Sequence, residues 1–124
     1  MSLVLIIEDN EKNMKLARDV LQAKGYQTAE AVTGEEGVKL AKERKPDLVL
    51  MDIQLPGING IEAFRQIRAD ATTAHIPVVA LTASVTPTDR SQITAAGFDA
   101  FISKPINLKE FLGTVKRLAE GGGK

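Results

Sequence analysis

The amino-acid sequence predicts an α/β fold, in which five parallel strands form one sheet with five helices on its two faces. Segments of strand length and segments with helical periodicity alternate five times along the 124 residues, as in sheets built from strand–helix–strand units. Several strand segments are continuous apolar runs, which indicate strands covered on both faces. With 44% hydrophobic residues, the chain is long enough for one domain with a real core.

The strand segments differ in composition, and this difference predicts their order in the sheet. Residues 3–7, 48–51 and 78–81 are continuous apolar runs, so we expect them at the centre. Residues 27–31 and 99–102 mix polar and apolar side chains, as edge strands do. With the second and fifth strands at the edges the order is 2-1-3-4-5, a flavodoxin-like, doubly wound sheet. The first and third strands are then neighbours, and a site is expected in the crevice at their carboxyl ends.

Four of the helical segments carry apolar residues at spacings of three and four. These are Met14, Leu16, Ala17, Val20 and Leu21 in the first, Val38, Leu40 and Ala41 in the second, Ile61, Phe64 and Ile67 in the third, and Leu108, Phe111, Leu112, Val115 and Leu118 in the fifth. The fourth segment, residues 87–96, has one large apolar residue, Ile93. We therefore expect the fourth helix to be the least firmly packed.

Residues that begin and end helices agree with this division. Thr33 and Asn107 each precede a glutamate by three residues, the spacing of an N-cap and its capping partner. Pro87 suits the first turn of the fourth helix. Gly25 and Gly97 lie where the first and fourth helices are expected to end.

Composition excludes several classes of function. Sixteen basic and sixteen acidic residues cancel, and without a basic run nothing predicts nucleic acid or a membrane surface as a partner. There is no cysteine and no apolar stretch near the roughly 20 residues of a membrane span. We expect a cytoplasmic protein with one domain over residues 1–120 and a flexible glycine-rich tail over 121–124.

Charged and hydroxyl side chains follow the expected strands. Glu8 and Asp9 follow the first strand, Asp52 ends the third, Thr82 ends the fourth, and Lys104 follows the fifth. Three carboxylates in one crevice repel each other and need a cation, and hard oxygen ligands suit Mg²⁺. Lys104 can hold a phosphoryl oxygen or pair with Asp52, and Thr82 can donate a hydrogen bond. An aspartate nucleophile beside a metal and a lysine is a layout for phosphoryl transfer.

This set, together with Ala83 and Pro105 and in this order and spacing, resembles the CheY-like receiver domain of two-component response regulators. The resemblance covers essentially the whole chain. The stretches IIEDNEKNMKL, LVLMDIQLPGINGIE and HIPVVALTA resemble most nearly the single-domain regulators of the DivK type, and almost as well the receivers of hybrid histidine kinases. A regulator that acts alone and a receiver domain excised from a hybrid kinase both remain open.

The resemblance implies an acceptor and a metal site. Asp52 accepts a phosphoryl group from a phosphohistidine on a histidine kinase or histidine phosphotransfer protein. Asp9 and Asp52 bind Mg²⁺ directly, Glu8 binds it through water, and the backbone carbonyl of Gln54 supplies a further ligand. Glu8 replaces an aspartate that is common in the family, which keeps the charge and lengthens the reach.

The resemblance also implies a switch rather than an enzyme, although the protein catalyses its own phosphorylation and dephosphorylation. Thr82 and Lys104 sense the phosphoryl group, and Phe101 occupies the position of the family's switch aromatic, often a tyrosine. The implied output is a downstream protein that binds the face formed by the fourth helix, the fifth strand and the fifth helix of a monomer.

Two other classes of function fit less well. An aspartyl-phosphate hydrolase of the haloacid dehalogenase type needs a second acid two residues after the nucleophile, where Gln54 cannot act as a general acid. A flavodoxin-like electron carrier needs a phosphate-binding loop after the first strand and aromatic residues around the flavin. Here that loop is acidic, and the chain has one Tyr and no Trp.

Five residues receive ordinary structural interpretations. His75, the single histidine, is expected at the surface in a polar loop. Gly57 and Gly60 are interpreted as turn glycines. Phe98 and Phe111 are candidates for the core.

Overall fold

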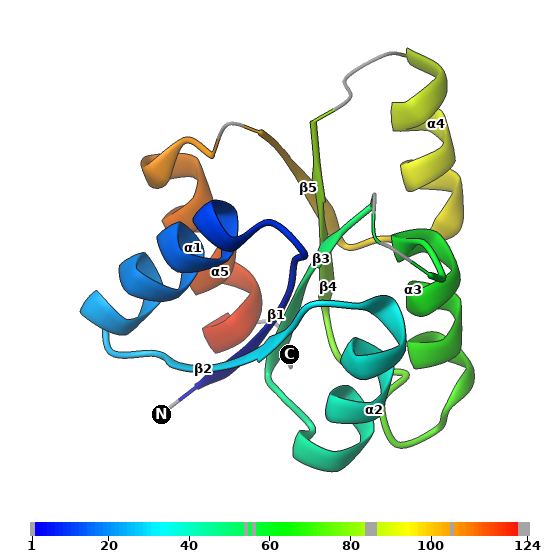
Figure 1. Cartoon of the computed structure of the whole chain (residues 1–124), viewed down its shortest axis with the longest axis horizontal. Helices are drawn as coiled ribbons and strands as arrows, with labels where there is room; N and C mark the ends of the chain where they lie inside the picture. The colour runs from blue at the N-terminus through cyan, green and yellow to red at the C-terminus, as the bar shows by residue number, and fades with distance from the viewer. Residues whose placement is uncertain (1, 54, 56, 84–86, 105, 122–124) are drawn as a thin grey trace.

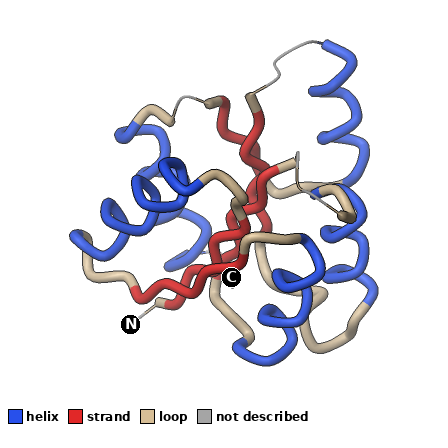
Figure 2. Tube along the Cα trace, in the orientation of Figure 1, coloured by secondary structure: helices blue, strands red, loops and turns tan. Residues whose placement is uncertain are grey.

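The computed structural model describes residues 2–53, 55, 57–83, 87–104 and 106–121, with only the backbone described for 87–90 and 120–121. These residues form strands and helices in strict alternation (Figures 1 and 2). The elements are β1 Leu3–Ile7, α1 Glu11–Ala23, β2 Gln27–Ala31, α2 Gly34–Arg44, β3 Leu48–Asp52, α3 Gly60–Ala69, β4 Val78–Thr82, α4 Pro87–Ala96, β5 Ala100–Ser103 and α5 Leu108–Gly121.

The five strands form one parallel sheet in the order β2-β1-β3-β4-β5. Helices α1 and α5 cover one face, and α2, α3 and α4 cover the other (Figure 1). The predicted fold class, strand order and five helices are therefore confirmed. The third and fourth strands end at Asp52 and Thr82, as predicted, and the fifth covers 100–103 rather than 99–102.

The side chains of alternate residues on the central strands point into two separate apolar layers. On β1, Leu5 and Ile7 point into the layer beneath α2 and α3, whereas Val4 and Ile6 point into the layer beneath α1 and α5. Both layers are closed to water, and all of β3 and β4 is buried. The central strands read as continuous apolar runs because helices cover both of their faces.

Two residues of the predicted apolar stripes are exposed. Leu16 has an exposed fraction of 39%, because the buried stripe of α1 is Met14, Ala17 and Leu21 and a residue two positions from Met14 points to another side of the helix. Leu108 has an exposed fraction of 48% and is the first residue of α5, one turn before the buried Phe111. For these two positions the prediction was wrong.

The predicted helix caps are present. The Thr33 side chain accepts a hydrogen bond from the Glu36 amide at 3.1 Å, and Asn107 does the same for the Glu110 amide at 3.1 Å. Asn10 caps α1 by accepting from the amide of Asn13. Helix α4 begins at Pro87, and Gly25 and Gly97 have φ values of +90° and +100° at the ends of α1 and α4.

Two further expectations concern membrane-spanning helices and the C-terminal tail. Among the described residues, no helix combines the length and apolar character needed to cross a membrane. Helix α5 includes Gly121, the first residue of the predicted tail, and residues 122–124 lie outside the described part of the chain. The division into a domain and a flexible tail stays a prediction.

Helix α4 is the least anchored helix in the described part of the chain. Of its described side chains, residues 91–96, Ile93 alone is buried. Helix α5 buries Phe111 and Val115 and packs Leu112 and Leu118 partly into the same layer. Less buried apolar area means a smaller free energy of local opening.

We predict that the backbone amides of α4 exchange with solvent deuterium faster than those of α5. The expected difference is at least tenfold in protection, which corresponds to about 1.4 kcal/mol in opening free energy. Hydrogen exchange followed by NMR measures both helices in one sample. Equal protection in α4 and α5 would show that buried area does not determine local stability here.

Candidate functional site

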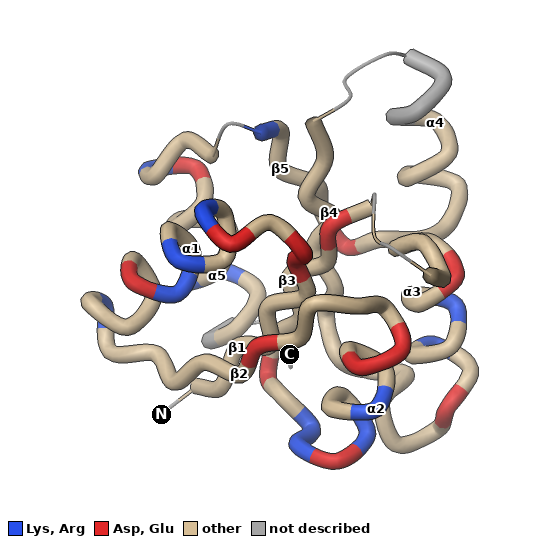
Figure 3. The backbone as a smooth tube through the Cα atoms, in the orientation of Figure 1, with Lys and Arg blue, Asp and Glu red and all other residues tan. Residues whose placement is uncertain are grey.

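The register of the parallel strands brings the predicted site residues to one edge of the sheet. Ile7 of β1 is paired with Met51 of β3, and Asp52 is paired with Leu81 of β4. Because all strands point the same way, their last residues lie at the same edge. Acidic residues lie at this edge, just after β1 and at the last position of β3 (Figure 3). Glu8, Asp9, Asp52, Thr82 and Lys104 therefore come from the ends of four different strands.

The centre of the site is one lysine between two buried carboxylates. The Nζ atom of Lys104 lies 2.7 Å from Oε1 of Glu8 and 3.1 Å from Oδ2 of Asp52. The exposed fractions of the three side chains are 14%, 1% and 6% in that order. Oε2 of Glu8 also accepts a hydrogen bond from the Asn10 amide at 3.1 Å. The expected pairing of Lys104 with Asp52 is confirmed, and Glu8 is a second partner.

The three charges shift one another's protonation. Burial, together with the adjacent Asp52 carboxylate, raises the pKa of Glu8 to about 7, although the Lys104 ammonium and the Asn10 amide act in the opposite direction. Burial alone would lower the pKa of Lys104, but the two carboxylates outweigh it and raise this pKa. The lysine therefore carries its positive charge, but this one charge does not balance two ionised carboxylates.

Glu8, Asp9 and Asp52 together form a set of oxygen ligands suited to a divalent cation. One carboxylate oxygen from each of the three lies within 4.8 Å of the others. Glu8 and Asp52 are buried, whereas Asp9 is exposed and leaves the group open to solvent on one side. Oxygen ligands with an open side fit Mg²⁺, which keeps several of its waters. Gln54, whose carbonyl was predicted as a further ligand, lies outside the described residues.

Thr82 and Phe101 lie beside this cluster. Thr82 has an exposed fraction of 3% at the end of β4, and its carbonyl accepts a hydrogen bond from the Lys104 amide at 2.8 Å. Phe101 is half-buried on β5 and is paired with Ala80, two residues before Thr82. The strand ends that carry Thr82 and Lys104 are thus fixed to each other, with Phe101 next to them.

Gly60 has a role at the site that the sequence interpretation missed. It is not a turn glycine but the first residue of α3, and its amide donates to the Ile53 carbonyl at 2.9 Å. A Cβ atom at this position would lie 2.4 Å from the carbonyl oxygen of Asp52. Glycine is therefore required for α3 to begin against the backbone of the buried aspartate. The signal available in the sequence was Asn59, an N-cap directly before this glycine.

The loop after Asp52 is also held by α2. The Glu35 carboxylate accepts a hydrogen bond from the Ile58 amide at 3.3 Å. Gly57, at φ +74°, lies so close to this carboxylate that an added Cβ would be 2.7 Å from its oxygen. Nothing in the sequence singled out Glu35, because the contact joins residues 23 positions apart.

His75 is exposed in the turn before β4, as predicted.

Known proteins with a similar sequence or structure agree with this geometry. The sequence profile of the family described as "Response regulator receiver domain" matches residues 4–116. The polar-differentiation response regulator DivK of Brucella anthropi is 47% identical over 113 residues, which cover 91% of this chain and 92% of that protein.

Two solved structures share the fold over nearly the whole chain. The receiver domain of the sensor histidine kinase PA1611 from Pseudomonas aeruginosa has a TM-score of 0.90 and 30% identity, covering 96% of this chain and 98% of that one. It was crystallised with a magnesium ion coordinated in its active-site cleft. The chemotaxis protein CheY4 of Vibrio cholerae has a TM-score of 0.89 and 25% identity, covering 95% and 98% of the two chains.

We predict that Gly60→Ala destabilises the protein by about 2 kcal/mol, since the new methyl group must displace the Asp52 backbone or the start of α3. Urea unfolding measures the change. Gly113→Ala in α5 is the matched control, because a Cβ there meets nothing within 4 Å and alanine favours helix by up to about 1 kcal/mol. The same sign of effect at both glycines would contradict the close approach at Gly60.

We predict that Asp52→Asn stabilises the metal-free protein by about 1 kcal/mol, raising its Tm by roughly 3–6 °C. The change keeps the side-chain shape, removes one charge beside buried Glu8 and leaves the Glu8–Lys104 pair intact. Thermal unfolding in a chelator measures it. Asp47→Asn is the control, because Asp47 is exposed and asparagine can still accept the hydrogen bond from Leu3. A lower Tm for Asp52→Asn than for the parent would show that repulsion at the site is negligible.

Proposed function

The chain belongs to the family of response regulator receiver domains, the switch proteins of two-component signalling, and we propose that Asp52 is its phospho-acceptor. The observation that carries the proposal is the position of this side chain. It is buried at the end of β3, 3.1 Å from the ammonium of Lys104, and it shares an oxygen cluster with Glu8 and Asp9. The other acids of the cluster follow β1, where the first of them is already hydrogen-bonded to the Asn10 amide.

The reaction needs little chemistry from the chain beyond position and charge. A carboxylate oxygen of Asp52 attacks the phosphorus of a phosphohistidine; the P–O bond forms while the P–N bond breaks, and its electron pair returns to the imidazole. Asp9 and Asp52 would hold Mg²⁺ directly and Glu8 would hold it through water, and the bound ion would supply positive charge for the phosphoryl oxygens. The donor set fits this ion, as the magnesium in the related PA1611 receiver supports.

Lys104 and Thr82 hold the transferred group. Lys104 is already 3.1 Å from the Asp52 oxygen, so its ammonium can pair with a phosphoryl oxygen once Asp52 carries an acyl phosphate, while Glu8 at 2.7 Å keeps it in place. The Thr82 hydroxyl can donate to another phosphoryl oxygen from the end of β4. The proposed sensing roles of both residues rest on this geometry.

Partners follow from the family. Receiver domains of two-component systems work with histidine kinases. In finer terms, the proposed donor is a histidine kinase or a histidine phosphotransfer protein of a phosphorelay, and the proposed setting is the cytoplasm. Among the receivers, a DivK-type regulator is favoured over a hybrid-kinase receiver, because identity is 47% across 92% of the length of DivK and 30% with the PA1611 receiver.

The proposed output is a protein that binds the face formed by α4, β5 and α5 of a monomer. Strand β5 is an edge of the sheet, so this face adjoins solvent. When the Thr82 hydroxyl turns to the phosphoryl group, the Phe101 ring can move inward behind it. A full burial of such a ring gains about 1.5–3 kcal/mol, so a ring that is already half-buried gains about half of that. This shifts a two-state population by roughly fourfold to thirteenfold.

We predict that acetyl phosphate with Mg²⁺ phosphorylates the parent protein and that Asp52→Asn abolishes the labelling. Intact-mass spectrometry detects the adduct. Asp47→Asn, at an exposed aspartate outside the cluster, serves as the control and should be labelled like the parent. Undiminished labelling of Asp52→Asn would place the acceptor at another residue.

Asp9→Ala should need much more Mg²⁺ for the same labelling, since it removes one direct ligand.

We predict that activation buries the Phe101 ring further. Beryllofluoride with Mg²⁺, which mimics an aspartyl phosphate, should shift the ring signals in side-chain NMR. Because the ring has no hydroxyl and is half-buried from the start, part of the population should already be active-like without phosphoryl. Phe98→Leu, at a ring stacked on Phe64 near α3, is the control aromatic change. Ring signals that do not respond to beryllofluoride would rule out this route.

A further inference from the structure

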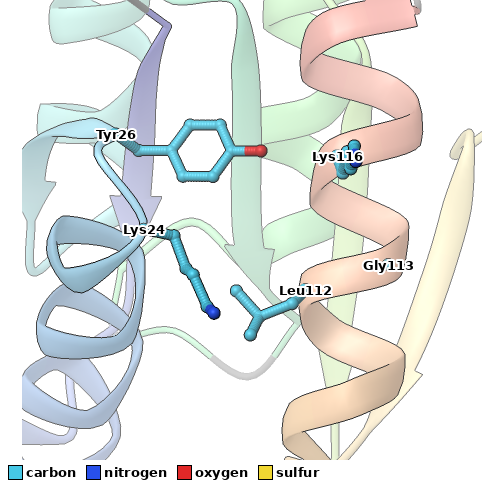
Figure 4. A pocket seen from close by; sticks show the side chains of 5 residues that line it. All are labelled: Lys24, Tyr26, Leu112, Gly113 and Lys116. Carbon is cyan, nitrogen blue, oxygen red and sulfur yellow. The ribbon is translucent and has the colours of Figure 1, made fainter.

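A hollow lies between the end of α1, the start of β2 and α5 (Figure 4). Its volume is about 430 Å³, and it is lined by Lys24, Tyr26, Leu112, Gly113 and Lys116. Lys24 and Tyr26 stand between the end of α1 and the start of β2, and the other three come from α5. The hollow lies beside Gln27, the first residue of β2. The last residue of β2, Ala31, is paired with Ile7, which ends β1 next to the acidic cluster. The hollow and the acidic cluster are therefore separated by the length of a strand.

The hollow is positively charged on its rim and apolar on its floor. Neither Lys24 nor Lys116 forms an ion pair with any carboxylate of the described residues. The Lys24 ammonium reaches toward Leu112, and the Tyr26 ring extends toward α5 (Figure 4). Leu112 and Tyr26 are half-buried against the apolar layer beneath α1 and α5. Two cations beside an apolar surface are complementary to an anion with an apolar body.

Gly113 points to a ligand independently of the charges. It lies in the interior of α5, where glycine costs about 0.5–1 kcal/mol relative to alanine. A Cβ at Gly60 would collide with the backbone, but a Cβ at Gly113 would meet nothing within 4 Å. Packing within the described chain therefore gives no reason for glycine at this position. What glycine does provide is an open floor, where another molecule can approach the helix backbone.

We propose that this α1–α5 hollow binds a small organic anion, a carboxylate or a phosphate ester carried on a flat apolar body. Lys24 and Lys116 take the anionic group, and the apolar body lies on Leu112, beside the Tyr26 ring and over Gly113. The volume of about 430 Å³ is within the range of small-molecule sites, roughly 300–1,000 Å³. The site is separate from the phospho-acceptor and does not depend on its function.

The probe is phenyl phosphate, titrated into the full chain and followed by ¹⁵N NMR in metal-free buffer, so that the acidic cluster does not compete for it. Phenyl phosphate should shift the amides of residues 24–26 and 112–116 and saturate. Phenol has only the flat apolar body and inorganic phosphate has only the anionic group, so each should bind roughly tenfold more weakly. Equal shifts with inorganic phosphate would contradict the proposal, since any cationic surface gives that result.

Two variants separate the site from general surface charge. Lys24→Ser with Lys116→Ser should weaken phenyl phosphate binding about fivefold to tenfold, as expected for two exposed charge contacts. Lys39→Ser with Arg44→Ser makes the same charge change at exposed positions on α2 and should leave binding unchanged. An equal loss in both double variants would overturn the proposal.

Gly113→Leu tests the shape of the hollow without risk to folding. Leucine is a better helix former than glycine, and the space beside Gly113 is open, so the variant should be at least as stable as the parent. Its side chain fills the floor, and binding of phenyl phosphate should fall at least tenfold while both lysines remain. Unchanged binding in a stable Gly113→Leu protein would show that the anion does not enter this hollow.

Discussion

The structure of the site depends on one lysine that pairs with two buried carboxylates. Lys104 lies 2.7 Å from Glu8 and 3.1 Å from Asp52, and both acids are almost fully removed from water. A buried carboxylate without a partner costs several kcal/mol, so these three strand ends must stay together. The order β2-β1-β3-β4-β5 places β1 beside β3, and the Lys104 amide bond to Thr82 fixes the end of β5 against β4. The strand order that defines the fold therefore also brings the charged side chains of the site together.

The same cluster explains why the site can switch. Two buried carboxylates share one ammonium beside the exposed Asp9, and burial raises the pKa of Glu8 to about 7. Added positive charge would stabilise the cluster, and in the proposed function a phosphoryl group bound with Mg²⁺ would bring new partners for Lys104 and Thr82. Gly60 and Glu35 keep the Asp52 backbone and its following loop in place while the charges rearrange. In the proposed function, the response would therefore fall on the side chains of β4 and β5, where Phe101 lies.

The sequence predicted the features that local signals determine. Apolar runs that end in polar residues located Glu8, Asp9, Asp52 and Thr82, and parallel strands bring such ends to one edge whatever the packing in detail. Features that depend on contact between distant segments were missed. Examples are the double pairing of Lys104, the approach of Gly60 to Asp52 and the contact of Glu35 with Ile58. The exposure of Leu16 and Leu108 was missed because periodicity places residues around a helix but not against a particular sheet.

The most direct test of the shared lysine is a double-mutant cycle between Glu8→Gln and Lys104→Gln. Urea unfolding of the parent, both single variants and the double variant, in metal-free buffer about one unit above the pKa of Glu8, gives the coupling free energy. The buried pair at 2.7 Å predicts a coupling of about 1–3 kcal/mol. Changes that add within about 0.5 kcal/mol would contradict it, because Lys104 would then not be what holds the carboxylates together.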